Sequence, residues 1–169
     1  MSKINWHNAI HPSPMFSELE NHPLPYDVLL EYGLRCCFAV EEELTKEQNE
    51  IVAKVNTLKG LDEELIAIRE SMKEKHLSSA GKNDTLEKET TFWFNAGVRC
   101  LLQDRQAYDT DAPIRAGDSD LKRVYYCLSA AVSRRYAPSI NFPFSAESKY
   151  IDKKFARILR EIVPDPTIY

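Results

Sequence analysis

Residues 44–77 of this chain read LTKEQNEIVAKVNTLKGLDEELIAIRESMKEKHL, and this stretch decides the fold. Most of its residues favour helix, and apolar residues recur in it every seven positions. One heptad position holds Leu44, Ile51, Leu58, Leu65 and Met72. The position three residues further on is only half apolar, because charged residues flank Leu61 and Ile68 there. The pattern predicts a long, amphipathic, partly coiled-coil-like helix.

The start of this helix has its own signal. Thr45-Lys-Glu-Gln48 matches a capping box, in which the threonine side chain and the glutamine side chain each bond the other residue's backbone N–H. Gly60 interrupts the stretch, but the heptad spacing continues across it. We therefore expect one kinked helix rather than two. Continuous from Lys46 to His76, it would be about 46 Å long, so part of it would project from a compact core.

The rest of the chain completes a helical bundle. A loop, LSSAGKN at 77–83, and a second capping signature at 84–87 predict an antiparallel partner helix, giving a hairpin over about 46–108. Two more helices are expected over 118–136 and 146–163, from apolar residues at helical spacing. A helix beginning at Pro25 is apolar on so much of its surface that it belongs in a core. The prediction is a single all-α domain over 25–169.

The first 24 residues differ from this domain. They hold three prolines, and Pro25 follows directly; these prolines argue against a continuous helix, whereas several apolar residues there would not be needed in a free tail. We expect an irregular, extended Pro-rich arm over 1–24. It would lie across its own domain or across a neighbouring chain, and the sequence leaves both open.

Composition and motifs exclude several classes of site. The chain has five glycines, and neither a GxxxxGK[ST] loop nor a GxGxxG loop is present, which argues against P-loop and Rossmann nucleotide sites. No GxSxG elbow supports nucleophilic hydrolysis. The best metal candidates are His7, His11 and His22, but the prolines around them disfavour a shared helix face, and surface histidines are the preferred interpretation. We expect no cofactor and no enzymatic activity.

Two further expectations concern the cysteines and the compartment. Cys36, Cys37, Cys100 and Cys127 show no metal or redox spacing, so we interpret them as small buried apolar residues. The chain shows no signal peptide pattern and no run of about 20 apolar residues. Those absences favour a cytoplasmic protein with no membrane association.

Charge is unevenly distributed along the chain. The overall net charge is −4, but residues 1–90 carry 17 acidic and 10 basic residues, whereas 121–163 carry three acidic and nine basic ones. The basic side chains that we select as candidate phosphate contacts are Lys122, Arg123, Arg134, Arg135, Lys149, Lys153, Arg157 and Arg160. A basic helix face can follow a phosphate backbone, so a nucleic-acid-binding accessory subunit is the alternative function. The competing interpretation is a solvated face.

The favoured function is that of a non-enzymatic helical adaptor or subunit of a larger complex. The amphipathic hairpin would contact other protein subunits or a second copy, through Ile51, Leu58, Leu65 and Met72. An enzyme with a dispersed site remains a third hypothesis. Its sign would be a deep polar pocket that holds histidine and carboxylate together.

Overall fold

The computed structural model describes residues 5–19, 25–79, 85–102, 120–136 and 146–164, and every regular element in those ranges is a helix. The α-helices are α1 (Pro12–Leu19), α2 (Tyr26–Ala39), α3 (Lys46–Thr57), α4 (Asp62–Ser79), α5 (Leu86–Leu101), α6 (Asp120–Tyr136) and α7 (Ala146–Ile162). Two 3-10 turns, η1 (Trp6–Asn8) and η2 (Glu41–Glu43), complete the set for these ranges. The predicted all-α class is confirmed. Within the described ranges, no helix has both the length and the apolar character that crossing a bilayer requires.

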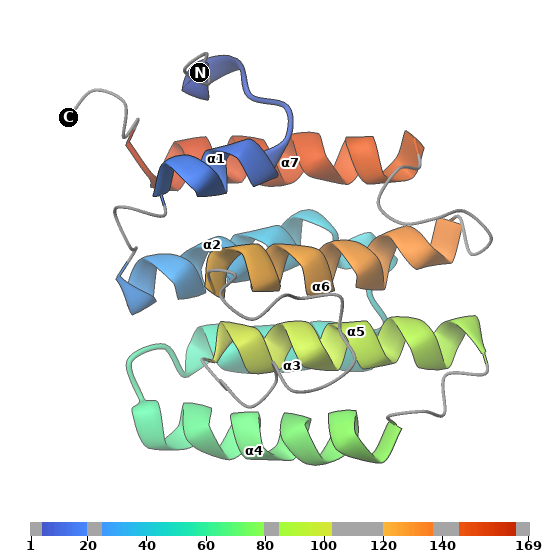
Figure 1. The fold of residues 1–169 in the computed structure, drawn as a ribbon. Helices are drawn as coiled ribbons and strands as arrows, with labels where there is room; N and C mark the ends of the chain where they lie inside the picture. Colours follow the sequence, from blue (N-terminus) through green and yellow to red (C-terminus); the bar gives the residue numbers. More distant parts are fainter. Residues whose placement is uncertain (1–4, 20–24, 80–84, 103–119, 137–145, 165–169) are drawn as a thin grey trace.

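The helices lie in rows with their axes roughly aligned (Figure 1). One row holds α1 and α7, the next holds α2 and α6, and α5 follows beyond them. Contacts link α2 to α7, α6 to α7, α2 to α3, and α5 to both α6 and α4. Helix α4 therefore forms one edge of the molecule (Figure 1).

The expected irregular arm is wrong for Pro12–Leu19, which form helix α1. Pro12 and Pro14 fall at the first and third helical positions, where backbone N–H groups have no partner within the helix, so the missing hydrogens cost nothing. Met15, Phe16 and Leu19 are buried, and α1 packs on α6 and α7 of its own chain. The remaining residues of the predicted arm, 1–4 and 20–24, lie outside the described residues.

The expected continuous helix over 46–76 is also wrong. It ends at Thr57, and α4 begins five residues later at Asp62. Gly60 adopts a φ of +84°, a left-handed conformation that interrupts a right-handed helix and that glycine adopts at little cost. The predicted capping box is confirmed: the Gln48 N–H donates to Thr45 Oγ1 over 3.1 Å, and the Thr45 N–H donates to Gln48 Oε1 over 2.9 Å.

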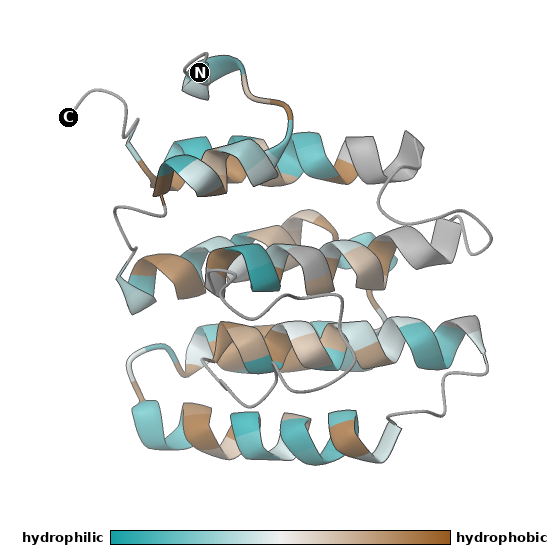
Figure 2. Cartoon of the chain, viewed as in Figure 1, coloured by the Kyte–Doolittle hydropathy of each residue, from teal (hydrophilic) through white to brown (hydrophobic). Residues whose placement is uncertain are grey.

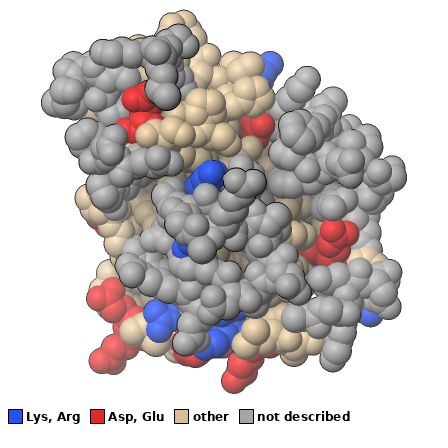
Figure 3. All heavy atoms as spheres, viewed as in Figure 1, with Lys and Arg blue, Asp and Glu red and all other residues tan. Residues whose placement is uncertain are grey.

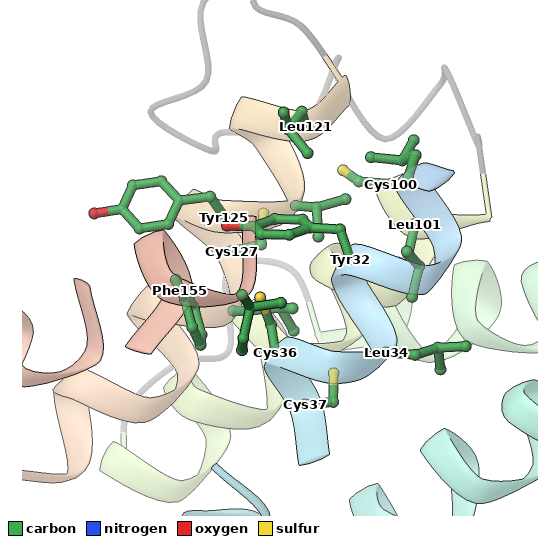
Figure 4. Packing of buried hydrophobic residues seen from close by; sticks show 14 of the residues in the cluster. Tyr32, Leu34, Cys36, Cys37, Cys100, Leu101, Leu121, Tyr125, Cys127 and Phe155 are labelled. Atoms are coloured by element: carbon green, nitrogen blue, oxygen red, sulfur yellow. The ribbon is translucent and has the colours of Figure 1, made fainter. Parts of the chain in front are cut away.

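Helices α5 and α6 pack closely against each other. At Gly97 a Cβ atom would come within 3.2 Å of the Cys127 Cβ and within 3.0 Å of Leu128. Buried side chains of α2, α6 and α7 meet nearby, among them Tyr32, Cys127 and Phe155 (Figure 4). Apolar residues dominate α5 in the interior, whereas hydrophilic and hydrophobic bands alternate along α4 (Figure 2). The core thus lies around α5 and α6, and α4 is a partly buried edge.

Helices α4 and α5 pack together as the predicted hairpin requires. Because of the turn at Gly60, α3 is a separate helix, and the Glu47–Lys75 ion pair links it to α4. Thr85 caps α5 by accepting from the Lys88 N–H over 3.2 Å. The predicted extension of this helix to 108 and the start of the next at 118 lie outside the described residues. The last two helices, α6 and α7, are found where the sequence places them.

Candidate functional site

A partly open groove of about 480 Å³ lies between α3 and α4. Its apolar lining consists of Ile51, Leu58, Ile68 and Met72. The other lining residues are Lys54, Glu64, Ala67, Ser71 and Lys75. Three of the four residues predicted as a contact surface therefore line one concave site, although they belong to two helices and not to one.

The turn between α3 and α4 reverses the chain and leaves space between the two helices, and the groove occupies that space. The Leu58 N–H donates to the Lys54 carbonyl at the end of α3, and the Leu61 N–H then bonds the Leu58 carbonyl over 3.0 Å. Three acidic residues, Asp62, Glu63 and Glu64, fill the first turn of α4, where negative charge is favourable. The turn thus fixes where α4 begins and which of its sides faces α3.

An ion pair joins α3 and α4 at the end of the groove away from the turn at Gly60. Lys75 Nζ of α4 lies 3.2 Å from Glu47 Oε1 of α3, and both side chains are largely exposed. A pair of this kind contributes only about 0–1 kcal/mol. The position of α4 therefore depends mainly on its buried side, which includes Leu65 and Met72.

A polar contact fixes the C-terminal part of α4 against α5. Arg99 Nη1 donates to His76 Nδ1 over 2.6 Å, and both residues are buried. Because a guanidinium is only a donor, Nδ1 acts as the acceptor and the ring proton is on Nε2. The His76 ring also contacts Phe92 edge-on, with centroids 4.4 Å apart. The α4 wall of the groove is thereby anchored on α5.

The groove suits apolar side chains presented by a helix. Ile51 and Leu58 are seven residues apart, so they span about two helical turns or ~10.5 Å. That length matches apolar anchors at positions i, i+3 or i+4, and i+7 of an incoming helix. Lys54, Glu64 and Lys75 supply charges of both signs around the apolar floor. The lining contains no histidine or cysteine.

The predicted contact residues differ in how accessible they are. Ile51 and Leu58 are half-buried, whereas Leu65 and Met72 are only 4% and 2% exposed. Leu65 belongs to the core and does not line the groove. The sequence also missed Ala67 and Ser71, two exposed residues of the α4 wall. Their signal was weak because small residues do not mark an apolar stripe.

The predicted basic residues are not gathered on one exposed face in the part of the chain that the structure describes. Arg123 is buried, Lys122 is half-buried, and Arg160 donates to the Ala9 carbonyl. Lys153 and Arg157 are exposed on α7, and Arg157 Nε lies 3.3 Å from Glu161 Oε1. The side chains of Arg134, Arg135 and Lys149 lie outside the description. Nucleic-acid binding stays a prediction.

His11 has a partner that the sequence did not reveal. Its Nδ1 atom lies 3.0 Å from Asp152 Oδ2, and the Tyr125 hydroxyl donates to the other oxygen of that carboxylate. Asp152 is buried, whereas the His11 side chain is 45% exposed. Within the described residues, no group of three histidine, cysteine or acidic side chains is arranged to hold a metal ion. His22, the third candidate ligand, lies outside them.

The cysteines are found as predicted: all four are buried and none is in a disulfide. Burial raises the pKa of Cys37 to about 12. Burial is also the main cause of a raised pKa at Cys36, and the neighbouring Cys37 adds to it. For Cys127 a hydrogen bond with Cys100 is the main cause of a raised pKa, and burial is second. The thiols of Cys36, Cys37 and Cys127 therefore remain protonated at neutral pH, which suits packing and not nucleophilic chemistry.

Comparison with known proteins gives no match: no family model, no curated protein and no solved structure matches this chain.

Proposed function

We propose that the protein is a non-enzymatic helical adaptor or complex subunit that binds an amphipathic helix of another protein in the groove between α3 and α4. The observation that carries this proposal is the convergence of Ile51, Leu58, Ile68 and Met72 on one groove. Such a groove exposes apolar area that is stabilised when a helix covers it.

The chemistry of the lining supports a protein ligand. Charges of both signs surround the apolar floor: Lys54 from α3, and Glu64 and Lys75 from α4. A helix with an apolar stripe and mixed charges beside it satisfies both features, because its apolar residues enter the floor while its polar flanks meet the rim.

The experiment fills the groove without disturbing the core. Ser71 lies on the groove wall and is exposed, so Ser71→Phe places a ring in the binding volume. Ala53→Phe is the matched control, because Ala53 is an exposed helical residue outside the lining. Leu65→Lys is unsuitable, since it would bury a charge in the core.

Affinity purification from source cells, quantified by mass spectrometry, compares the wild type with both variants. We expect a specific partner to be retained by the wild type and by Ala53→Phe and to be lost by Ser71→Phe. Circular dichroism must show the same thermal transition for all three proteins. A partner held equally by Ser71→Phe would place binding elsewhere, and so would a partner lost equally by both variants.

A further inference from the structure

We infer that a second copy of this chain packs against α4, on the side away from the groove, with the two α4 helices antiparallel. The surface involved consists of Ile66, Glu70, Lys73 and Leu77 and is called the α4 ridge below. The inference is separate from the proposed function, because none of these four residues lines the groove.

Exposed apolar side chains are concentrated at α4. Five large apolar residues are exposed in the described ranges, and three of them are Leu61, Ile66 and Leu77. Ile66 and Leu77 are 46% and 48% exposed although they lie on a helix whose inner side is packed. Single exposed apolar residues need no explanation, and these two lie about 16 Å apart along the helix, so the charged residues between them decide whether this face is a contact surface.

The four ridge residues share one face of α4. Ile66, Glu70 and Leu77 are exposed and Lys73 is half-buried, and the Glu70 carboxylate also lies 3.5 Å from Arg69 Nε of its own helix. They are spaced by four, three and four residues, which keeps them within about 60° of arc at ~100° per residue. Ser71 and Ala67, which line the groove, point roughly 90–130° away from the middle of this face. Helix α4 therefore has an inner side, a groove side and a ridge side.

The ridge is complementary to itself in an antiparallel arrangement only. In an antiparallel pair, the two-fold axis passes the helix between residues 71 and 72. Ile66 and Leu77 are equally far from that point, so each lies opposite the other in the second copy. Glu70 and Lys73 are also equally far from it, so they too lie opposite each other. The contact would then have apolar layers at both ends and opposite charges in its two central layers. A parallel arrangement would instead oppose Glu70 to Glu70 and Lys73 to Lys73, which is unfavourable.

The wider charge distribution agrees with this orientation. Three carboxylates, Asp62, Glu63 and Glu64, occupy the first turn of α4, whereas Lys73 and Lys75 lie towards its end on either side of Glu74. Antiparallel pairing brings each acidic end near the basic end of the other copy and also opposes the helix dipoles. Acidic and basic side chains are interspersed along the edge of the molecule where α4 lies (Figures 1 and 3).

The contact is small, which sets the expected behaviour. Helix α4 has 18 residues and is about 27 Å long, so one helix from each copy buries an area at the low end for specific interfaces. We expect a reversible dimer whose population rises with concentration, with a limiting mass twice the 19.4 kDa of the chain.

Charge reversal tests the central layers by sedimentation equilibrium over a wide concentration range. Glu70→Lys and Lys73→Glu each create two like-charge layers, so each should raise the dimer dissociation constant at least about tenfold. The double variant Glu70→Lys/Lys73→Glu restores opposite charges and should recover the wild-type constant to within a few-fold. Ile10→Lys, at an exposed apolar residue outside α4, is the control and should dimerise like the wild type.

Cysteine cross-linking tests the register. The four native cysteines are buried, so a mild oxidant should act on introduced thiols first. The double variant Ile66→Cys/Leu77→Cys should form a covalent dimer. Each single variant should not, because the two copies of one position would lie about 16 Å apart along the axis.

Three outcomes would overturn the inference. A wild type that stays monomeric at every concentration would mean that another protein or solvent alone covers the ridge. A single Ile66→Cys variant that cross-links as readily as the double variant would indicate parallel pairing. Failure of the charge-swapped double variant to regain dimerisation, with its fold intact by circular dichroism, would show that Glu70 and Lys73 do not face each other.

Discussion

Gly97 lies on the side of α5 that packs against α6, and buried neighbours leave little room there for a larger side chain. A Cβ atom there would already be 3.0 Å from Leu128 and 3.2 Å from Cys127. The two methyl groups of Gly97→Val would force these buried neighbours apart, and we expect a loss of about 2–3 kcal/mol in the free energy of unfolding. Urea denaturation measures this change in the free energy of unfolding. Ala53→Val, at an exposed helical position, should change it by less than about 1 kcal/mol, and a similar loss in both variants would contradict the packing argument.

The buried thiol of Cys37 makes stability depend on alkaline pH. Its pKa is about 12 in the folded protein, against the ordinary value of 9.0, so the unfolded chain releases this proton first as pH rises. Stability is then full below about pH 9 and falls as pH rises towards 12, because the folded state binds more protons in that window. We expect a slope of up to about 1.4 kcal/mol per pH unit from this thiol.

Chemical denaturation at a series of pH values from neutral to alkaline measures that slope. Cys37→Ala removes the group, so the variant should lose stability less steeply than the wild type above about pH 9. Cys36, Cys127 and Tyr32 also have raised pKa values and leave a residual slope in the variant. Parallel slopes for the wild type and the variant would show that Cys37 is accessible to solvent in the folded state.

Asp152 connects three helical elements, and this connection gives the prediction at the scale of the element. Its two oxygens bind His11, beside α1, and Tyr125, in α6, while Arg160 of α7 donates to the Ala9 carbonyl. Asp152→Ala removes the acceptor of a buried tyrosine hydroxyl and one tie to the N-terminal segment. We expect a loss of about 1–3 kcal/mol in stability.

Hydrogen exchange locates this effect. Amide protons of η1 and α1 should exchange faster in Asp152→Ala, whereas those of α5 should change only through the global loss of stability. Glu161→Ala, at an exposed carboxylate of the same helix, is the control and should leave α1 protected. Equal acceleration over the whole chain would mean that the N-terminal segment does not open separately from the core.

Patterns of neighbouring residues predicted individual helices and caps well. They did not predict contacts between residues far apart in the sequence. The capping box at Thr45 and Gln48 depends on residues three apart, and it is present as expected. The heptad spacing across Gly60 did not imply continuity, because α3 and α4 each direct an apolar side inward, and both therefore carry apolar residues at helical spacing. The contact of His11 with Asp152 joins residues 141 positions apart, and no sequence pattern encodes it.

The candidate site was predicted in composition and not in shape. Ile51, Leu58 and Met72 were selected as one side of a rod, and they line a groove because the chain reverses between Leu58 and Leu61. Leu65 was selected with them by spacing alone, but on α4 its position falls on the packed side. Periodicity shows which residues share a face of one helix. It does not show what covers that face.

At the scale of the whole molecule, α4 lies at an edge (Figure 1). One of its sides lines the groove, and the α4 ridge lies on another. Both surfaces lie on one helix but in different directions, so binding in the groove should not block pairing of the ridges. If both proposals hold, the assembly contains two copies of this chain and two partner helices, with the grooves on outward sides of the dimer.

Native mass spectrometry of the reconstituted complex tests this arrangement. Glu70→Lys should give a complex of one chain with one partner, with unchanged affinity for the partner, because it disrupts only the ridge. Ser71→Phe should give a dimer without partner, because it fills only the groove. Loss of the partner from Glu70→Lys, or loss of the dimer from Ser71→Phe with its fold intact, would show that the two sides of α4 form one binding surface. The separation of groove and ridge would then be wrong even if each residue were a true contact.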